Sequence, residues 1–96
     1  MKLTPELAEP LQGSDFHCEV AEGAPVALRL QAVKEAGVGQ GFRQFSLHFS
    51  GPLETPLMQG TYEIHHPVLG DGPLFIVPVA REAEQMCYEA ACSCRG

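Results

Sequence analysis

Two adjacent histidines, His65 and His66, are the residues in this sequence best suited to metal binding or acid–base chemistry. They end the segment TYEIHH, in which Tyr62 and Ile64 alternate with polar residues, as in a half-buried strand. Neighbouring strand residues point to opposite faces, so the two imidazoles do not share one metal ion in ordinary strand geometry. We expect His66 to follow Tyr62 and Ile64 inward and to bond to a backbone carbonyl at the core edge. The alternative is a ligand or catalytic role.

A second set of polar side chains is expected on the outer face of the same sheet: His17, Glu19, His48, Glu63 and His65. If their strands are neighbours, these imidazole and carboxylate groups could converge into a zinc site or a general-base site. The alternative is the usual one for an outer face, namely solvated side chains without a ligand. We therefore predict no metal and no cofactor, and we keep four candidate metal ligands: His17, His48, His65 and Glu63.

The cysteines and serines carry no catalytic signature. Cys87, Cys92 and Cys94 are spaced as C-x4-C-x-C, which is neither a zinc knuckle nor a redox or haem-attachment motif. No serine lies in a G-x-S-x-G elbow. We expect reduced thiols that are buried as small apolar side chains or lie in a frayed C-terminus, with adventitious metal capture as the alternative. No catalytic residue is predicted.

The composition argues against several classes of partner. The 96 residues suffice for one small β domain, residues 1–96, with a single core. Twelve acidic against six basic residues leave a net charge of −6, and the basic residues are scattered, so neither nucleic acid nor a membrane surface is expected as a partner. The N-terminus has no apolar signal region and no apolar run is long enough to span a bilayer, which predicts a cytoplasmic protein.

Period-two alternation over most of the chain predicts a β fold. Thr4 and Pro5 form a helix-start signal, and Pro10 limits that helix to about two turns. The glycine-rich stretches Gly37–Gly41 and Gly70–Pro73 are predicted as a loop and a turn. The predicted fold class is mainly β, a six-stranded antiparallel roll or barrel with a short N-terminal helix. The predicted strands are 16–20, 26–34, 44–49, 61–66, 74–79 and 86–92.

The inward faces of these strands supply the predicted core. We also expect Gly60, two residues before Tyr62, to adopt a backbone conformation that a Cβ would strain. Pro78 lacks an N–H group and should mark a bulge or an edge position. The core residues are Phe16, Leu28, Leu30, Phe45, Leu47, Phe49, Tyr62, Ile64, Leu74, Ile76 and Tyr88.

One strand has more apolar surface than a single core can cover. In the segment PLFIVPVA, Phe75, Val77 and Val79 lie on the face opposite Leu74 and Ile76. Either the N-terminal helix, through its leucines, or a second subunit covers this face. Because symmetric dimers commonly bury such a surface, we predict a homodimer with Phe75, Val77 and Val79 as its self-association face.

Three segments together resemble a family of small bacterial proteins classed as a domain of unknown function. FSLHFSGP, LMQGTYEIHHPVLG and LFIVPVAREAEQMCYEA follow the pattern F-x-L-x-F-x-G-P, then Q-G-x-Y-x-x-x-H-P-x-L-G, then L-F-x-V-P-V and Y-E-A. The resemblance covers Phe45 to Ala90 and implies membership rather than an activity, because the family has no assigned reaction. It also implies a link to phage-tail-like assemblies. The tail ACSCRG departs from the family pattern.

Two functions of different classes follow from these observations. The favoured one is a structural or protein-interaction module of unknown function, an acidic β barrel whose edge strand or apolar rim docks a protein partner or a second copy of itself. The alternative is a small metal-dependent or acid–base enzyme that uses His48, His65 and Glu63. Since no motif supports a reaction, an enzyme is not expected.

Overall fold

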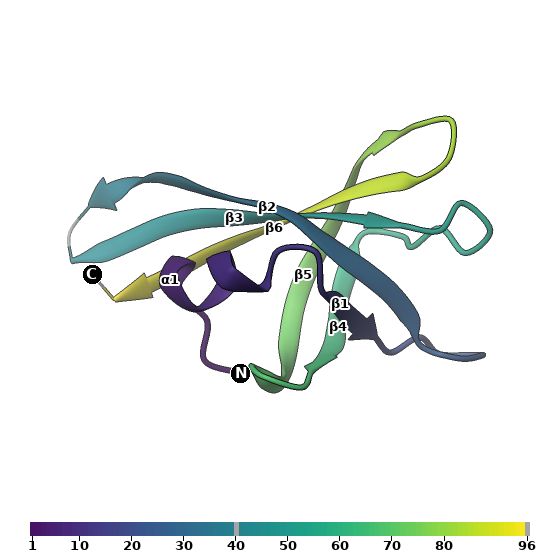
Figure 1. The fold of residues 1–96 in the computed structure, drawn as a ribbon, viewed down its shortest axis with the longest axis horizontal. Coiled ribbons are helices and arrows are strands. Elements are labelled where there is room, and N and C mark those ends of the chain that lie inside the picture. The colour runs from purple at the N-terminus through teal and green to yellow at the C-terminus, as the bar shows by residue number, and fades with distance from the viewer. Residues whose placement is uncertain (40, 96) are drawn as a thin grey trace.

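The computed structural model describes residues 1–39 and 41–95, and it is built mainly from strands (Figure 1). Six antiparallel strands and a short N-terminal helix are present, which confirms the predicted fold class. No helix among the described residues has the length and apolar character needed to cross a membrane. The elements are α1 (Pro5–Ala8), a 3-10 turn (Glu9–Leu11), β1 (Asp15–Cys18), β2 (Val26–Gly39), β3 (Phe42–Gly51), β4 (Gly60–His66), β5 (Gly70–Arg81) and β6 (Met86–Arg95).

The sheet closes on itself. Its strand order is β1-β2-β3-β6-β5-β4, and β1 also pairs with β4, so the six strands form a closed barrel. The pairing between β1 and β4 is short, with His17 opposite His65 and Cys18 opposite Ile64. All six pairings are antiparallel, as the run of strands without crossover helices requires.

Three strands continue beyond the closed part of the barrel and form an extension that we call the arm. It consists of residues 33–39 of β2, 42–47 of β3 and 90–95 of β6. In Figure 1 the arm runs to the left and ends near the C-terminus, while β5 turns away from β6. The pairing of β5 with β6 accordingly stops at Val77 opposite Glu89. The arm accounts for the elongated shape, with a longest dimension of 40 Å.

Helix α1 forms where the sequence signals it. The Thr4 hydroxyl accepts a hydrogen bond from the backbone N–H of Leu7 over 3.2 Å, and Pro5 occupies the first turn. Pro10 lies in the 3-10 turn, which ends the helical segment at Leu11. Pro5 and Ala8 are buried, and the helix packs near β2 rather than β5.

The core has the composition that period-two alternation predicts, except for Tyr62. Ten of the eleven predicted core residues are buried, whereas Tyr62 is only partly buried and packs at the core margin. Its hydroxyl donates to the Met58 carbonyl over 2.6 Å, so the polar end of the ring remains near the surface. Five further apolar residues complete the buried core: Ala8, Cys18, Val26, Leu57 and Ala90.

The predicted glycine-rich loop and turn are shorter than expected: the chain turns at Gly41 and at residues 67–69, but the glycines beside these turns lie in strands. Gly37 to Gly39 belong to β2 and Gly70 to Pro73 belong to β5, because pairing with β3 and β4 supplies ladder partners that outweigh the low strand propensity of glycine. Gln40, within the predicted loop, lies outside the described residues. Strand β1 ends at Cys18, two residues earlier than predicted, whereas β6 continues to Arg95. Pro78 lies at a register shift, as predicted.

The prediction that a Cβ would strain the backbone at Gly60 is wrong. Gly51 is a glycine at which a Cβ does not fit. Gly60 has no positive φ, and a Cβ there would meet only the Tyr62 ring at 3.7 Å, an ordinary contact. At Gly51, by contrast, a Cβ would lie 2.8 Å from the Leu28 side chain and 3.1 Å from the Tyr88 ring. Glycine at position 51 is therefore required by close packing between β3 and two core side chains.

Candidate functional site

His66 points into the protein as predicted, at the end of β4, but its partner differs from the prediction. The side chain is buried with 5% exposure, and its Nε2 lies 2.9 Å from the Ser14 hydroxyl rather than next to a backbone carbonyl. Its Nδ1 accepts a hydrogen bond from the backbone N–H of Val68 over 3.0 Å. The ring also packs against Phe16, with centroids 4.4 Å apart.

These contacts fix the protonation pattern of the buried imidazole. Because Nδ1 accepts the Val68 N–H, the ring proton of neutral His66 lies on Nε2 and is donated to Ser14 Oγ. The Ser14 hydroxyl in turn donates to the Leu11 carbonyl over 2.5 Å. Burial lowers the pKa of His66, and the charge of nearby His17 adds to this. His66 is thus a neutral structural residue that joins β4 to the segment before β1.

His65 points outward and lies between two carboxylates. Its Nδ1 is 2.7 Å from Asp71 Oδ1, and its Nε2 contacts the Glu19 carboxylate. The hydrogen bond to Asp71, followed by that to Glu19, raises the pKa of His65. Once protonated, both ring nitrogens donate and no lone pair remains for a metal ion or for proton abstraction. The residue therefore holds the chain after β1, β4 and β5 together at the surface.

Of the other four predicted outward residues, Glu19 contacts this imidazole, His17 and Glu63 lie on neighbouring positions, and His48 is absent from the group. His17 lies directly opposite His65 across the β1–β4 pair, and the backbone carbonyl of Glu63 accepts from the N–H of Glu19 over 2.9 Å. Asp71, which sequence analysis treated as a turn residue, completes the cluster. The position of Asp71 could have been predicted from a three-residue turn after His66, because a turn of that length sets Asp71 opposite His65. Within residues 1–39 and 41–95, no three His, Cys, Asp or Glu side chains are arranged to hold a metal ion.

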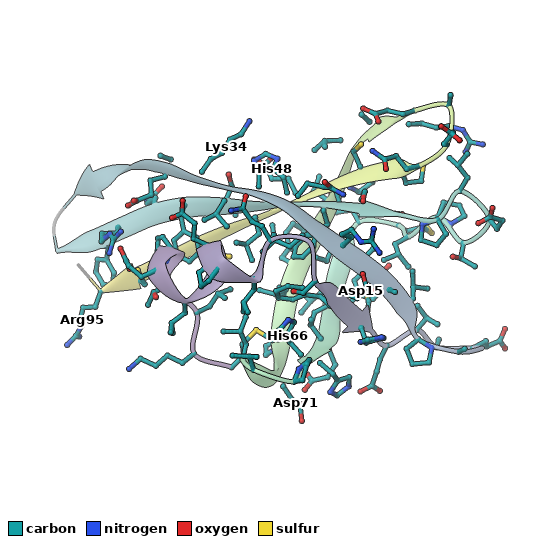
Figure 2. All side chains as sticks on the ribbon, viewed as in Figure 1. Asp15, Lys34, His48, His66, Asp71 and Arg95 are labelled. Carbon is teal, nitrogen blue, oxygen red and sulfur yellow. The ribbon has the colours of Figure 1, made fainter. Side chains whose placement is uncertain are left out.

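His48 is separated from the other predicted site residues. It lies on β3, and two strands separate β3 from β4 in either direction around the barrel. In Figure 2 His48 lies above β2, whereas His66 and Asp71 lie on the opposite side of the molecule. The His48 Nε2 is 3.0 Å from the Ser46 hydroxyl and 3.6 Å from a Glu89 carboxylate oxygen. His48, His65 and Glu63 therefore do not form one site.

The cysteines are free thiols in apolar or half-buried positions. Cys18 is fully buried, and Cys87, Cys92 and Cys94 are half-buried on β6. Burial raises the pKa of both Cys18 and Cys92 to about 11, which keeps these thiols protonated and weakly nucleophilic. Cys92 and Cys94 pack against the core from the arm, so the C-terminal residues continue a strand rather than fray.

An ion-pair group that sequence analysis did not identify joins the helix to the arm. Arg43, only 23% exposed at its side chain, donates through two nitrogens to Glu6 and through two to Glu35. These hydrogen bonds, first to Glu6 and then to Glu35, raise the pKa of Arg43, and the same contact lowers the pKa of Glu6. No short-range pattern marks this group, because its members come from α1, β2 and β3.

The outer face of β5 is exposed, as the candidate self-association surface requires. Phe75 is 48% and Val79 is 53% exposed, while Val77 between them is half-buried. The N-terminal helix does not cover them, because it packs near β2. Their inward neighbours Leu74 and Ile76 are buried in the core, so β5 is apolar on both faces.

An open depression lies between the β1–β2 turn and the loop before β4, with a volume of about 450 Å³. Its lining is largely apolar and includes Val20, Pro25, Pro56 and Leu57, with Glu22 as the acidic residue. Glu22 is the one titratable residue among the described residues of this lining, so the depression lacks a pair of groups for acid–base catalysis.

Comparison with known proteins gives a family without an assigned activity. A family model described as a domain of unknown function (DUF6916) matches residues 3–92. Neither the curated proteins nor the solved structures contain a match to this chain.

Proposed function

The chain belongs to the DUF6916 family of domains of unknown function, and we propose that it is a protein-interaction module that forms a homodimer through the outer face of β5. The observation that carries the proposal is the exposure of Phe75, whose neighbours Leu74 and Ile76 are buried, together with the exposure of Val79 farther along β5. A link to phage-tail-like assemblies rests on the family resemblance alone.

The surroundings of the β5 face suit association with protein. Thr61 lies opposite Phe75 on β4, and Glu89 lies opposite Val77 on β6, so the apolar strip has a polar neighbour on each side. Apolar patches with a polar rim are typical of protein interfaces. The net charge of −6 does not prevent self-association, because physiological salt screens exposed charges beyond about 8 Å.

The alternative function, an enzyme that uses His48, His65 and Glu63, has no supporting arrangement. His48 lies on the other side of the barrel from His65, and both nitrogens of His65 are engaged by carboxylates. A general base needs a free lone pair within hydrogen-bond reach of its substrate, and His65 has none when protonated.

The test is the mass of the protein in solution at tens of micromolar concentration, measured by light scattering or sedimentation. The wild-type chain should have twice the monomer mass, and the double variant Phe75→Thr/Val79→Thr should have the monomer mass with an unchanged circular-dichroism spectrum. Threonine keeps the strand propensity while removing apolar surface. The matched control is Val68→Thr, which removes a 70% exposed valine from the turn between β4 and β5.

Val68→Thr should leave the dimer intact. A wild-type chain that stays monomeric over this concentration range, or a Phe75→Thr/Val79→Thr variant that dimerises as tightly as wild type, would refute the proposal.

A further inference from the structure

The arm has two strand edges that no strand of this chain covers among the described residues. On β2, pairing with β1 ends at Arg29 opposite Asp15. Leu30 makes two further backbone hydrogen bonds, to the Ser14 carbonyl and from the Gly13 N–H, so residues 33–39 pair only with β3. On β6, residues 90–95 pair with β3 alone, because β5 leaves β6 after Glu89. Both edges offer backbone N–H and C=O groups to a further strand.

The two edges differ in how well they suit an added strand. The β2 edge carries a register shift between Glu35 and Gly37 and the charged residues Lys34 and Glu35, features that discourage edge pairing. The β6 edge, with the sequence AACSCR, pairs in continuous register with β3 from Phe42 opposite Arg95 onward. It contains no proline and no acidic residue, in a chain that has twelve acidic residues.

We propose that the β6 edge, residues 90–95, pairs antiparallel with the same edge of a second copy of the chain. This inference rests on the proposed function and specifies its interface. An antiparallel pair of identical strands has two-fold symmetry, so each copy presents the same backbone N–H and C=O groups to the other. The two arms then form one continuous sheet in which the β6 strands are central. The added strand lies on the side of β6 from which β5 diverges (Figure 1).

The alternation of side chains restricts the register. Directly opposite residues in an antiparallel pair point to the same face, and β6 has its even-numbered residues inward and its odd-numbered residues outward. Two registers keep the faces matched and pair five residues of the free edge. One sets Cys92 opposite its own copy and Ala91 opposite Ser93, and the other sets Ser93 opposite its own copy.

Charge also favours a second copy as the occupant. In the second register Arg95 lies opposite Ala91 of the other copy, and Glu89 of that copy is its diagonal neighbour, within reach of a long side chain. The first register would set Arg95 opposite Glu89, where Val77 of β5 already pairs, so the space along β6 favours the second register. Arg95 lies at the free end of the arm in Figure 2, where it is exposed. Each dimer therefore gains two symmetric attractions between acidic and basic groups at an edge that otherwise carries no charge.

Cysteine crosslinking tests the pairing directly. The two cysteine variants are made in a background of Cys92→Ala and Cys94→Ala, because the native thiols of this edge would otherwise crosslink in both. In the variant Ala91→Cys/Ser93→Cys, each register sets an introduced thiol opposite an introduced thiol of the other copy. Opposite Cα atoms lie about 4.5–5.5 Å apart, which a disulfide spans. The control is Gln44→Cys, because Gln44 is exposed on the same face and pairs with Ser93 one strand away from the edge. With diamide as oxidant, we expect crosslinking roughly 100-fold faster in the β6 variant, since paired thiols reach millimolar effective concentration.

A charge substitution supplies the second measurement. Ser93→Lys places a lysine on the edge and should raise the dimer Kd by about tenfold, whereas Gln44→Lys should leave it unchanged. If the wild-type chain is monomeric, the proposed function fails. If it is a dimer that Phe75→Thr/Val79→Thr dissociates, but the two cysteine variants crosslink at equal rates and Ser93→Lys has no effect, the proposed function holds and the β6 pairing is refuted.

Discussion

Both terminal nitrogens of Arg43 donate to the carboxylate of Glu6, over 2.9 and 2.6 Å, and this pair joins helix α1 to strand β3. A guanidinium can present two parallel N–H groups to a carboxylate, which a lysine ammonium does not. The helix itself is only four residues long, far too short to be stable alone. Its position therefore depends on this pair and on the burial of Pro5 and Ala8.

Replacing Arg43 with lysine should loosen the helix from the arm. We expect Arg43→Lys to lower the melting temperature and to speed amide exchange in residues 5–11, and both effects should shrink in 1 M salt, where exposed charges are screened. The control is Arg29→Lys, because Arg29 has one 3.4 Å contact with Asp15 and both side chains are largely exposed. Unchanged helix exchange in Arg43→Lys would contradict the role assigned to the pair.

Alanine at position 51 should destabilise the protein. Its Cβ would lie 2.8 Å from the Leu28 side chain, so the core must shift, and overpacking of this kind costs about 1–3 kcal/mol. Urea unfolding measures the change. Gly60→Ala is the matched control, since its Cβ has only an ordinary contact, and this variant should unfold within about 0.5 kcal/mol of wild type. Equal stabilities for the two variants would exclude close packing at Gly51.

Removing the Tyr88 hydroxyl should cost a buried hydrogen bond. The backbone N–H of Leu57 donates to Tyr88 Oη over 2.8 Å, and both residues are buried. In Tyr88→Phe the N–H loses its acceptor, which we expect to lower the free energy of unfolding by about 1–2 kcal/mol. In Tyr62→Phe the effect should be smaller, because the Met58 carbonyl that Tyr62 donates to remains near solvent. A reversed order would contradict this assignment.

Stability should depend on pH through His65 in a defined direction. Asp71 and then Glu19 raise the pKa of His65, so the folded state binds this proton more tightly than the unfolded chain. The stabilisation is complete below the unfolded pKa of about 6.5 and is lost as the pH rises through the raised folded value. His65→Gln should therefore lose more stability relative to wild type at pH 5.5 than at pH 9. Chemical denaturation at the two pH values measures this difference.

The buried histidine should show the opposite dependence. Burial lowers the pKa of His66, so its contribution is present above about pH 6.5 and is lost as the pH falls towards the folded pKa. Ser14→Ala removes the acceptor of its Nε2–H and should cost about 1 kcal/mol at pH 8. An NMR titration in which the His66 ring protonates above free histidine would contradict this account.

The faces of the strands were predictable because the period of two is local. Phe45, Leu47 and Phe49 alternate with polar residues, and pleating alone places them in the core. The inward direction of His66 follows from the same rule. The lengths of β2 and β5 were not predictable, since glycines that signal turns in isolation are held in strands by ladders with distant partners.

The contacts between side chains depended on strand order, which no local pattern contains. The separation of His48 from His65, and the meeting of Glu6 with Arg43, follow from which strands are neighbours in the closed barrel. The partner of His66 was missed for the same reason, because Ser14 precedes β1 and reaches β4 only after the barrel closes. Composition and the two-residue alternation of apolar side chains could predict the fold class. The candidate surfaces could be identified only once the strand order was known.

The short pairing of β1 with β4 has a consequence for folding kinetics. The β2–β3 hairpin is local in sequence and can form on the scale of about 1–10 µs, before any distant contact exists. Closure of the ring joins His17 and Cys18 to residues far along the chain, for a ladder of only two residue pairs. The entropy of closing that long loop is lost before the ladder compensates for it. We therefore expect ring closure to be the late, rate-limiting step of folding and the first contact to break during unfolding.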